Sequence, residues 1–321
     1  MKVAALPVFG DSDAFVIADE PMPVAGPGEV LIRVAAAGVN RADVLQRRGL
    51  YPSPADAPAW PGLEVAGVVE GLGDGVTNWA VGDRVCALIS GGGYAEFVVC
   101  NSSLVMPTPA GLTDVEAAAL PEAACTVWSN LRAGGLPGAS SILIHGGSGG
   151  IGTTAIQVAK ALGMRVIVTA GGRARTEKCV ELGADLAIDH REQDFAAVLQ
   201  DAGRVDMVLD CIGADYLARN LAALNDDGTL VNIGVQSGAV AELDLRSLMS
   251  RRLTIVGTTL RARPLRQKAK IVADVHENVW PLIPDRLRPV IHGTFPLAEV
   301  GAAHRALESG EVFGKLVLAV G

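Results

Sequence analysis

The chain has 321 residues, of which 50% are hydrophobic and 19% charged, and its formal net charge is −8. Single cores rarely grow beyond about 250 to 300 residues, so this length suits two domains. The acidic balance provides no basic surface for nucleic acid, and no apolar run reaches the roughly 18 residues of a membrane span. We therefore expect a soluble globular protein. The first residues show no signal peptide, so the expected location is the cytoplasm.

The five cysteines are odd in number and scattered along the chain. Most lie within apolar runs, which predicts small core residues in a reducing compartment. They are Cys86, Cys100, Cys125, Cys179 and Cys211.

Residues 1 to about 120 are expected to be rich in β-structure. Short, Val-rich segments alternate with Pro and Gly clusters: EVLIRVAAAGV, EVAGVVEGLG, DRVCALI and YAEFVV. They indicate a compact barrel-like or partly open β domain. From about residue 115 the pattern becomes helical, with an interruption near Pro121, and this marks the entry to a second domain.

From Ser141 onward, strands and helices alternate. The predicted strands are ILIHG, RVIVTA, DLAIDH, VDMVLDCIG, TLVNIGV and TIVGTTL, with helices in most of the intervals. Helical connections between successive strands require crossovers, which predict a mainly parallel sheet covered on both faces. After Arg261, two helices and two strands do not extend this pattern, and we expect them to return to the first domain.

A glycine-rich turn follows the first of these strands, in ILIHGGSGGIG. Gly147, Gly149 and Gly152 satisfy the pattern GxGxxG. Glycine is needed at such positions because a tight turn and a close approach of the backbone to pyrophosphate exclude a Cβ atom. The following helix, roughly Ile151 to Leu162, would aim its N-terminal amides at that group. The predicted phosphate-binding residues are Gly147, Ser148, Gly149, Gly150, Ile151 and Gly152. In a chain of parallel strands, this turn predicts a dinucleotide-binding Rossmann domain.

Several stretches, in order, carry a family resemblance: AAGVNRADVLQRRGLYP, PGLEVAGVVEGLG, GDRVCAL, GGGYAEFVV, HGGSGGIG, LDCIG, TTLRAR and FGKLVL. They resemble the quinone oxidoreductase (zeta-crystallin-like) branch of the zinc-independent medium-chain dehydrogenase/reductase superfamily, in particular the mammalian-type NADPH:quinone reductases. The resemblance implies an α/β protein. Residues 1–120 and 261–321 would form a GroES-like β-rich catalytic domain, and residues 121–260 a doubly wound Rossmann domain. It also implies NADPH in the cleft between the domains, and a homodimer that pairs strands near Thr254 to Thr258.

The positions that bind zinc in relatives argue against a metal here. Catalytic zinc needs three protein ligands from Cys, His and carboxylate residues, but the first two family positions read Asn40 and Leu63. Glu64 and Glu122 could each offer a carboxylate, although hydrogen bonding or helix capping is their expected role. No four-cysteine lobe follows Cys100. The sequence therefore predicts no zinc.

Without zinc, no strong Lewis acid polarises a simple alcohol for dehydrogenation. A quinone or an activated enone, by contrast, can accept hydride directly from the reduced nicotinamide. The resemblance places Asn40 and Tyr51 on the substrate side of the cleft. Asn40 would bond the nicotinamide or an acceptor carbonyl, or else stabilise a turn beside Gly38. Tyr51 would donate to a developing oxyanion, or else merely pack in its loop.

The resemblance also implies a cofactor groove built from separate segments. Its further residues are Thr126, Cys211, Ile212, Gly234, Val235, Leu260, Arg261, Phe313, Gly314 and Lys315, together with Asn40. His145 is expected to be a core histidine with satisfied hydrogen bonds. In the basic run of Arg261, Arg263, Arg266, Lys268 and Lys270, we expect mostly a solvated helix face, with only Arg261 reaching the cleft.

The end of the second Rossmann strand predicts NADPH rather than NADH. An NAD site usually places an acid there for the ribose 2′-hydroxyl, but this region reads VTAGGRARTEK. Gly171 and Gly172 leave room for a phosphate, and guanidinium groups suit its oxygens. The predicted 2′-phosphate residues are Gly172, Arg173, Arg175 and His190.

Three functions remain open. The first is an NADPH-dependent quinone reductase, and the second is an NADPH-dependent reductase of α,β-unsaturated carbonyls. The third is a cofactor-binding or RNA-binding protein with little turnover, against which the acidic charge argues. The expected partner is a small quinone or enone, with no nucleic acid and no membrane.

Overall fold

The computed structural model describes residues 1–55 and 57–321, which form two compact units. Unit 1 comprises Met1–Cys125 and Arg261–Gly321, and unit 2 comprises Thr126–Leu260. The division predicted from the sequence, with 1–120 and 261–321 as one domain and 121–260 as the other, stays a prediction. Among the described helices, none has the length and apolar character needed to span a bilayer.

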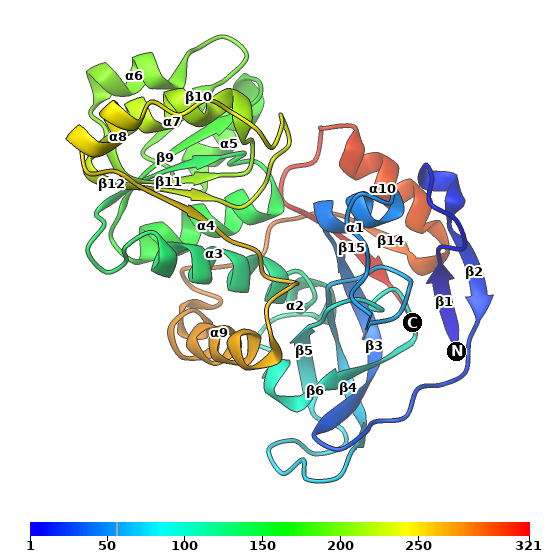
Figure 1. Ribbon diagram of the computed structural model, residues 1–321. Helices are drawn as coiled ribbons and strands as arrows, with labels where there is room; N and C mark the ends of the chain where they lie inside the picture. Colours follow the sequence, from blue (N-terminus) through cyan, green and yellow to red (C-terminus); the bar gives the residue numbers. More distant parts are fainter. Residues whose placement is uncertain (56) are drawn as a thin grey trace. The chain divides into compact units, whose positions relative to one another are not determined.

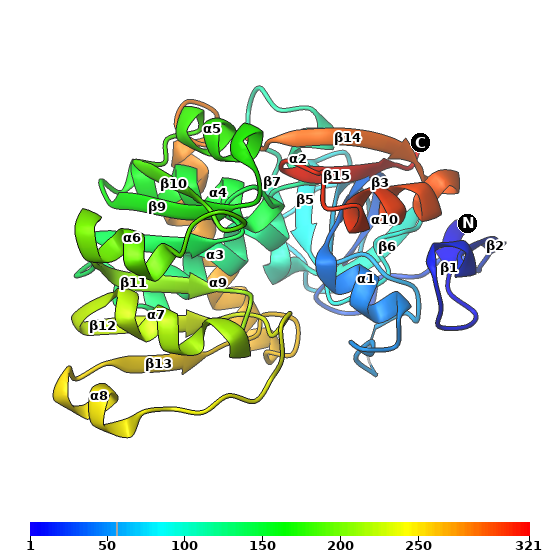
Figure 2. The ribbon, with the colours of Figure 1, turned by 90° about the horizontal axis from the view of Figure 1, so that it is seen from above.

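Unit 2 is built on a six-stranded parallel sheet. Its strands are β8 (Ser141–His145), β9 (Arg165–Ala170), β10 (Leu186–Asp189), β11 (Val205–Asp210), β12 (Leu224–Asn232) and β13 (Thr254–Gly257). Their order is β10-β9-β8-β11-β12-β13, with every neighbouring pair parallel (Figure 2). This is the strand order of a dinucleotide-binding Rossmann sheet. Strands are added on one side of β8 up to β10, and the next strand, β11, is added on its other side. The predicted Rossmann domain is confirmed.

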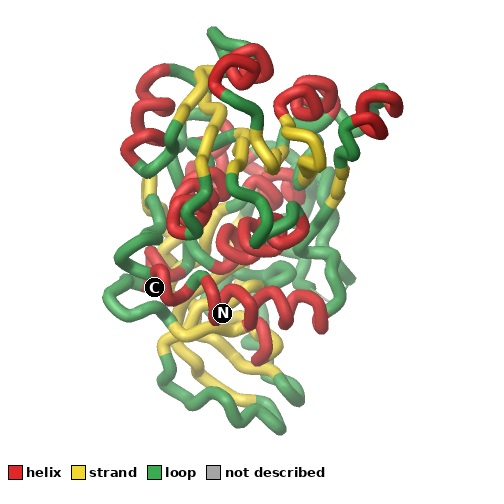
Figure 3. Tube along the Cα trace, turned by 90° about the vertical axis from the view of Figure 1, so that its left-hand side faces the viewer, coloured by secondary structure: helices red, strands yellow, loops and turns green. Residues whose placement is uncertain are grey.

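Helices cover both faces of this sheet (Figure 3). They are α4 (Gly150–Ala161), α5 (Arg173–Glu181), α6 (Phe195–Ala202), α7 (Leu217–Ala223) and the short α8 (Leu245–Ser250), with a 3₁₀ turn at Ala214–Tyr216. In Figure 1, α6 and α7 lie above β9 and β11, and α4 lies below. The strands are apolar on both sides because both faces are buried, as with Leu143, Ile167 and Leu230 in the core.

Unit 1 contains a seven-stranded, mostly antiparallel sheet. Its strands are β3 (Glu29–Val39), β4 (Glu64–Leu72), β5 (Arg84–Leu88), β6 (Phe97–Asn101), β7 (Val105–Pro107), β14 (Ile291–Pro296) and β15 (Lys315–Ala319). The order is β14-β15-β3-β4-β5-β7, with β6 also paired to β3. The red β15 therefore lies beside the blue β3 in Figure 1, and the expected return of the C-terminal segment is confirmed. A separate hairpin joins β1 (Lys2–Ala5) and β2 (Val16–Asp19).

The helices of unit 1 are α1 (Arg41–Arg47), α2 (Asp114–Ala117), α9 (Leu265–Asn278) and α10 (Val300–Glu308), and α3 (Pro121–Ala133) begins in it. Short 3₁₀ turns lie at Ser12–Ala14, Ser102–Leu104, Trp280–Leu282 and Leu297–Glu299. The sequence did not predict α1, because its buried face carries the polar residues Asp43, Gln46 and Arg47 and shows no apolar stripe.

One expectation about the basic run is wrong. Lys268 does not lie on a solvated face: its side chain is buried, and its Nζ donates to Ser90 Oγ at 2.6 Å. The helical period explains this, because Lys268 shares the inward face of α9 with Ile271, Val272 and Val275. Arg266 and Lys270 are exposed, as expected.

Candidate functional site

The glycine turn after β8 has the shape that a dinucleotide phosphate requires. A Cβ atom on Gly147 would lie 2.7 Å from Val168 Cβ, and one on Gly152 would lie 2.6 Å from Gly147 Cα. Both positions therefore exclude any other residue, and they bring α4 close to β8 and β9. Gly149 caps α4, so the first amides of that helix point toward the turn. The backbone thus fits the pyrophosphate of a dinucleotide.

Two further strand ends lie beside this turn, because β11 pairs with both β8 and β12. Cys211 follows β11, and its Sγ lies 3.6 Å from His145 O. A Cβ on Gly234, after β12, would lie 2.9 Å from Cys211 O. The structure therefore brings Gly146–Gly152, Cys211–Ile212 and Gly234–Val235 to the carboxyl edge of one sheet, where ligands of open α/β sheets bind.

The turn between β9 and α5 carries the residues predicted to select the coenzyme. Gly172 adopts φ +88° and its N–H donates to Asp189 Oδ1 at 2.9 Å. Arg173 is 91% exposed, and its Nε donates to Glu177 Oε1 at 2.7 Å, one turn along α5. The ion pair with Glu177 directs the Arg173 side chain along α5 rather than toward Gly171 and Gly172.

Arg191 is a residue that the sequence reasoning missed at this corner. A Cβ on Gly171 would lie 3.0 Å from Arg191 Nε and 3.1 Å from His190 Nε2. Both side chains therefore lie against the glycine turn, where the 2′-phosphate is expected. They reach it from the end of β10, which pairs with β9. The sequence did contain a signal for Arg191: the predicted strand DLAIDH ends beside two basic residues, His190 and Arg191.

His145 is a core residue, as expected. It is buried, with Nδ1 3.0 Å from Thr169 Oγ1 and Nε2 2.7 Å from Asn220 Oδ1. Burial lowers its pKa to about 4. Both ring nitrogens are engaged, so His145 supports the end of β8 rather than taking part in chemistry.

In unit 1, the predicted residues Asn40 and Lys315 meet at Glu64. Lys315 Nζ lies 2.5 Å from Glu64 Oε1 and 2.6 Å from Asn40 Oδ1. Asn40 Nδ2 donates to the same glutamate oxygen at 2.9 Å. The second oxygen, Glu64 Oε2, accepts the N–H of Glu122 at 2.9 Å and so caps α3. Asn40 thus uses both polar side-chain atoms within the chain.

This arrangement does not fit catalytic zinc. Leu63 is buried and offers no donor atom, and the Lys315 ammonium holds the carboxylate of Glu64. Within residues 1–55 and 57–321, no three His, Cys, Asp or Glu residues gather into a group that could hold a metal ion. The ammonium group of Lys315 therefore compensates the charge of the Glu64 carboxylate.

Tyr51 and Arg261 form the other part of the unit 1 site. The Arg261 guanidinium lies 5.2 Å from the centre of the Tyr51 ring, within cation–π distance. Arg261 is buried, and it donates to Ser90 O at 2.7 Å and to Gln46 Oε1 at 2.8 Å. These hydrogen bonds hold the guanidinium group in place against the Tyr51 ring.

The remaining predicted residues are placed at the ends of their elements. Thr126 and Leu260 are buried in unit 2, and Thr126 O accepts Asn130 Nδ2 at 2.7 Å. In unit 1, Gly314 adopts φ +95°, and a Cβ there would clash with Val290 O. Phe313 and Gly314 thus lead tightly into β15 and place Lys315 at its start.

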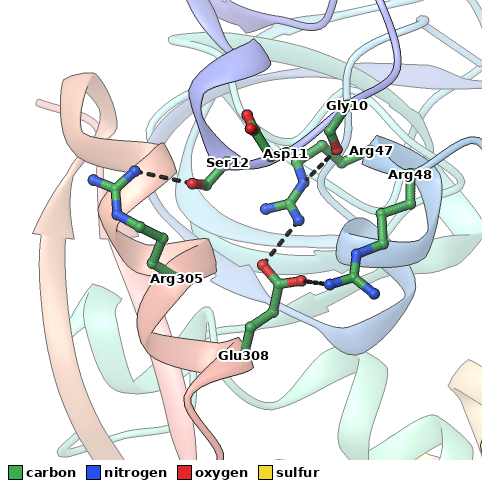
Figure 4. A pocket seen from close by; sticks show the side chains of 7 residues that line it. All are labelled: Gly10, Asp11, Ser12, Arg47, Arg48, Arg305 and Glu308. Carbon is green, nitrogen blue, oxygen red and sulfur yellow. Dashed lines mark hydrogen bonds and ion pairs between the residues drawn. The ribbon is translucent and has the colours of Figure 1, made fainter.

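A separate pocket of about 450 Å³ opens in unit 1 (Figure 4). Gly10, Asp11, Ser12, Arg47, Arg48, Arg305 and Glu308 line it, and none of them is a predicted site residue. Glu308 pairs with both Arg47 and Arg48, and Arg305 pairs with Asp13 at 2.6 Å. Arg47 Nη1 is buried and has no hydrogen-bond partner among the described residues.

Two protein families match the chain. The alcohol dehydrogenase GroES-like domain matches residues 26–110, and a family described as zinc-binding dehydrogenase matches residues 150–275. Quinone oxidoreductase of Rattus norvegicus is 31% identical over 315 residues, with 94% of this chain and 92% of that protein covered. A mycocerosic acid synthase-like polyketide synthase of Mycobacterium tuberculosis is 34% identical over 302 residues, but the chain spans only 14% of its length.

Solved structures agree. Quinone oxidoreductase from Thermus thermophilus, solved also in complex with NADPH, is 33% identical with a TM-score of 0.86, and each chain is covered completely. A 2-haloacrylate reductase is 29% identical with a TM-score of 0.83, with 100% of this chain and 99% of that chain covered. The fold and the relatives define an oxidoreductase of two-unit α/β architecture. The chain belongs to the medium-chain dehydrogenase/reductase superfamily and resembles its quinone oxidoreductases throughout.

Proposed function

We propose that the protein is an NADPH-dependent quinone reductase that works without metal. The observation that carries this proposal is the carboxyl edge of the unit 2 sheet, where Gly147 and Gly152 exclude a Cβ beside the N-terminus of α4. Those residues would hold the pyrophosphate, and His190, Arg191 and Arg175 the 2′-phosphate. Bound NADPH would supply a hydride to the acceptor. The chain's own part is to bind, orient and exclude water.

Reduction of an α,β-unsaturated carbonyl is the second candidate. It is favoured by the similarity to a 2-haloacrylate reductase, whose named substrate is an activated alkene. Both acceptors are electrophilic without a Lewis acid, and the ion pair of Lys315 with Glu64 beside Asn40 supports a reaction of this kind. The two candidates therefore share one site and differ only in acceptor.

Oxidation of NADPH with 1,4-benzoquinone, 9,10-phenanthrenequinone and a small enone tests the proposal. We expect turnover with both quinones at rates above that with the enone. Faster reduction of the enone would favour the second candidate. Tight NADPH binding without turnover on any acceptor would contradict both and indicate a cofactor-binding protein.

Tyr51→Phe should lower kcat and leave NADPH affinity nearly unchanged. The Tyr51 ring rests on the Arg261 guanidinium, and burial raises the pKa of its hydroxyl. A hydroxyl held in this way would donate to the acceptor oxygen, a contact made chiefly in the transition state. Steady-state kinetics and coenzyme titration separate the two effects.

The matched control is Tyr216→Phe, which removes a hydroxyl from a tyrosine packed on His145 in unit 2. It should leave kcat unchanged. If Tyr51→Phe turns over as fast as the unmodified protein, Tyr51 only lines the site.

We also propose a homodimer through β13. This strand stands at the edge of the unit 2 sheet, where its outer hydrogen-bonding groups can pair with a second copy (Figure 2). Ile255 on β13 is 39% exposed. A molar mass in solution equal to that of one chain would contradict the dimer.

A further inference from the structure

The pocket shown in Figure 4 lies where the N-terminal segment, α1 and α10 meet within unit 1. Its volume of about 450 Å³ falls in the range of small-molecule sites. The backbone around it is closely packed. Gly10 N–H donates to Arg47 O at 2.9 Å, and a Cβ atom on Gly301 of α10 would lie 2.5 Å from Ser12 O. The wall of the pocket is therefore held in place before any ligand binds.

Arg47 brings an unused hydrogen-bond donor to this pocket. Its side chain is buried, with Nε donating to Gly10 O at 3.2 Å and Nη2 to Glu308 Oε2 at 2.8 Å. Nη1 is buried as well and has no acceptor in the part of the chain that the structure describes. In Figure 4 this nitrogen carries no dashed line and points to the side where Ser12 lies. Buried donors of a charged group normally have partners, because they have lost their water.

Ser12 brings a second donor to the same space. Its side chain is buried, and its Oγ accepts a hydrogen bond from Arg305 Nη1 at 2.9 Å. A hydroxyl also has one hydrogen of its own to donate, and no acceptor for it occurs among residues 1–55 and 57–321. Arg305 thus holds the oxygen of Ser12 and leaves its hydrogen available. One charged and one neutral donor are ready for the two oxygens of a single group.

The side chains next to Arg47 carry an excess of one positive charge. Glu308 is the partner of both Arg47 and Arg48, so two guanidinium groups share one carboxylate. Arg47 is 1% exposed and Glu308 18%, so water screens this excess only in part. A ligand with one negative charge would balance it, whereas a dianion would exceed it.

The other charges of the pocket leave this excess in place. Arg305 pairs separately with Asp13, at 2.6 Å. Asp11 is exposed, and its Oδ1 accepts the N–H of Asp13 at 3.0 Å. Neither aspartate has a printed contact with the guanidinium of Arg47, whose carboxylate partner is Glu308.

We propose that this pocket is a binding site for a small organic carboxylate. One carboxylate oxygen accepts a hydrogen bond from Arg47 Nη1 and the other accepts one from the Ser12 hydroxyl, and its charge balances the excess at Arg47 and Arg48. The volume is larger than a carboxylate group, so an organic body fills the rest. None of the lining residues belongs to the predicted coenzyme or acceptor site, so the proposal does not depend on the proposed function.

Calorimetric titration of the unmodified protein with benzoate, without coenzyme, tests this site. Benzamide has the same shape without the charge, and phenyl phosphate carries a second negative charge. We expect benzoate to bind at least about tenfold more tightly than either, and to raise the unfolding temperature. Equal binding of benzamide, tighter binding of phenyl phosphate, or no binding of benzoate at about 10 mM would each overturn the proposal.

Two variants locate the bound benzoate. Ser12→Ala should weaken it about tenfold, because one donor is lost, and Arg47→Lys should weaken it at least as much, because the charge stays but Nη1 is gone. Arg33→Met is the control, since Arg33 pairs with Glu70 on the exposed side of β3, and it should bind benzoate like the unmodified protein. If Arg47→Lys fails to fold, Ser12→Ala decides alone. Unchanged affinity in Ser12→Ala would place benzoate elsewhere and overturn the proposal.

A last titration separates this pocket from the coenzyme site. With NADPH present at saturation, benzoate should bind as tightly as without it, because the two ligands use different residues. Mutually exclusive binding of benzoate and NADPH would contradict the pocket as the site. Failure of the protein to reduce quinones would overturn the proposed function and leave the benzoate result standing.

Discussion

Lys315→Met should lower the free energy of unfolding by about 3–5 kcal/mol, measured without coenzyme. The side chains of Lys315 and Glu64 are 5% and 0% exposed. Removal of the ammonium leaves a buried carboxylate without its cation, and that loss is much larger than the worth of the pair itself. It would also release Asn40, which links the end of β3 to β15. Denaturant unfolding followed by circular dichroism measures the change.

The matched control is Lys270→Met, because Lys270 pairs with Asp274 on the surface of α9, where the two side chains are 75% and 32% exposed. Its loss should cost less than about 1 kcal/mol. The double variant Lys315→Met with Glu64→Leu should recover most of the stability, since neither charge then remains buried. A double variant no more stable than the single one would contradict this electrostatic explanation.

The unmodified protein should favour NADPH over NADH by at least about tenfold in kcat/KM, roughly the worth of one charge-assisted hydrogen bond. No acid stands at the end of β9, and Gly171 and Gly172 leave space there. Arg173→Ala combined with Arg175→Ala should reduce the preference, by weakening NADPH while sparing NADH, and the part that remains should depend on His190 and Arg191. Equal use of both coenzymes would contradict the assignment.

The structure adds a sharper comparison at this corner. Arg191→Ala should reduce the preference more than Arg173→Ala, because Arg191 lies against Gly171 whereas Arg173 pairs with Glu177. Arg204→Ala is the control. This exposed arginine precedes β11, at the amino edge of the sheet, and its loss should not change kcat/KM with NADPH or with NADH. A greater effect for Arg173→Ala would show that its ion pair opens when NADPH binds.

The sequence predicted the parallel sheet and its glycine turn because both depend on local patterns. Buried strands such as β8 are continuous apolar runs, and the positions of Gly147 and Gly152 admit no Cβ. These features needed no knowledge of contacts between distant side chains.

The polar network of unit 1 could not be predicted in the same way. In it, Tyr94 Oη donates to Asp43 Oδ2 at 3.0 Å and lies 3.2 Å from His304 Nε2, across more than 200 positions of sequence in the second case. Each residue alone looks like a surface side chain. Burial raises the pKa of Asp43 to about 6 and lowers that of His304 to about 3. Only the folded chain shows that they are buried together.

Asn40 shows how the family resemblance and the contacts complement each other. The resemblance placed it in the site, but the structure shows its amide held by Glu64 and Lys315. Direct contact with the nicotinamide would have to use the second Nδ2 hydrogen or the second Oδ1 lone pair, which these bonds leave unused. The contacts of Asn40 favour a positioning role over the catalytic role that the sequence predicted. The catalytic role stays a prediction.

The central claim is hydride transfer to a quinone without metal, and one measurement tests it most directly. NADPH oxidation by 9,10-phenanthrenequinone should be followed on protein whose zinc content is known, before and after incubation with a chelator. We predict far less than one zinc per chain and an unchanged rate, because Asn40 and Leu63 offer no ligands and Lys315 holds Glu64. Stoichiometric zinc, with activity that the chelator abolishes, would contradict the account.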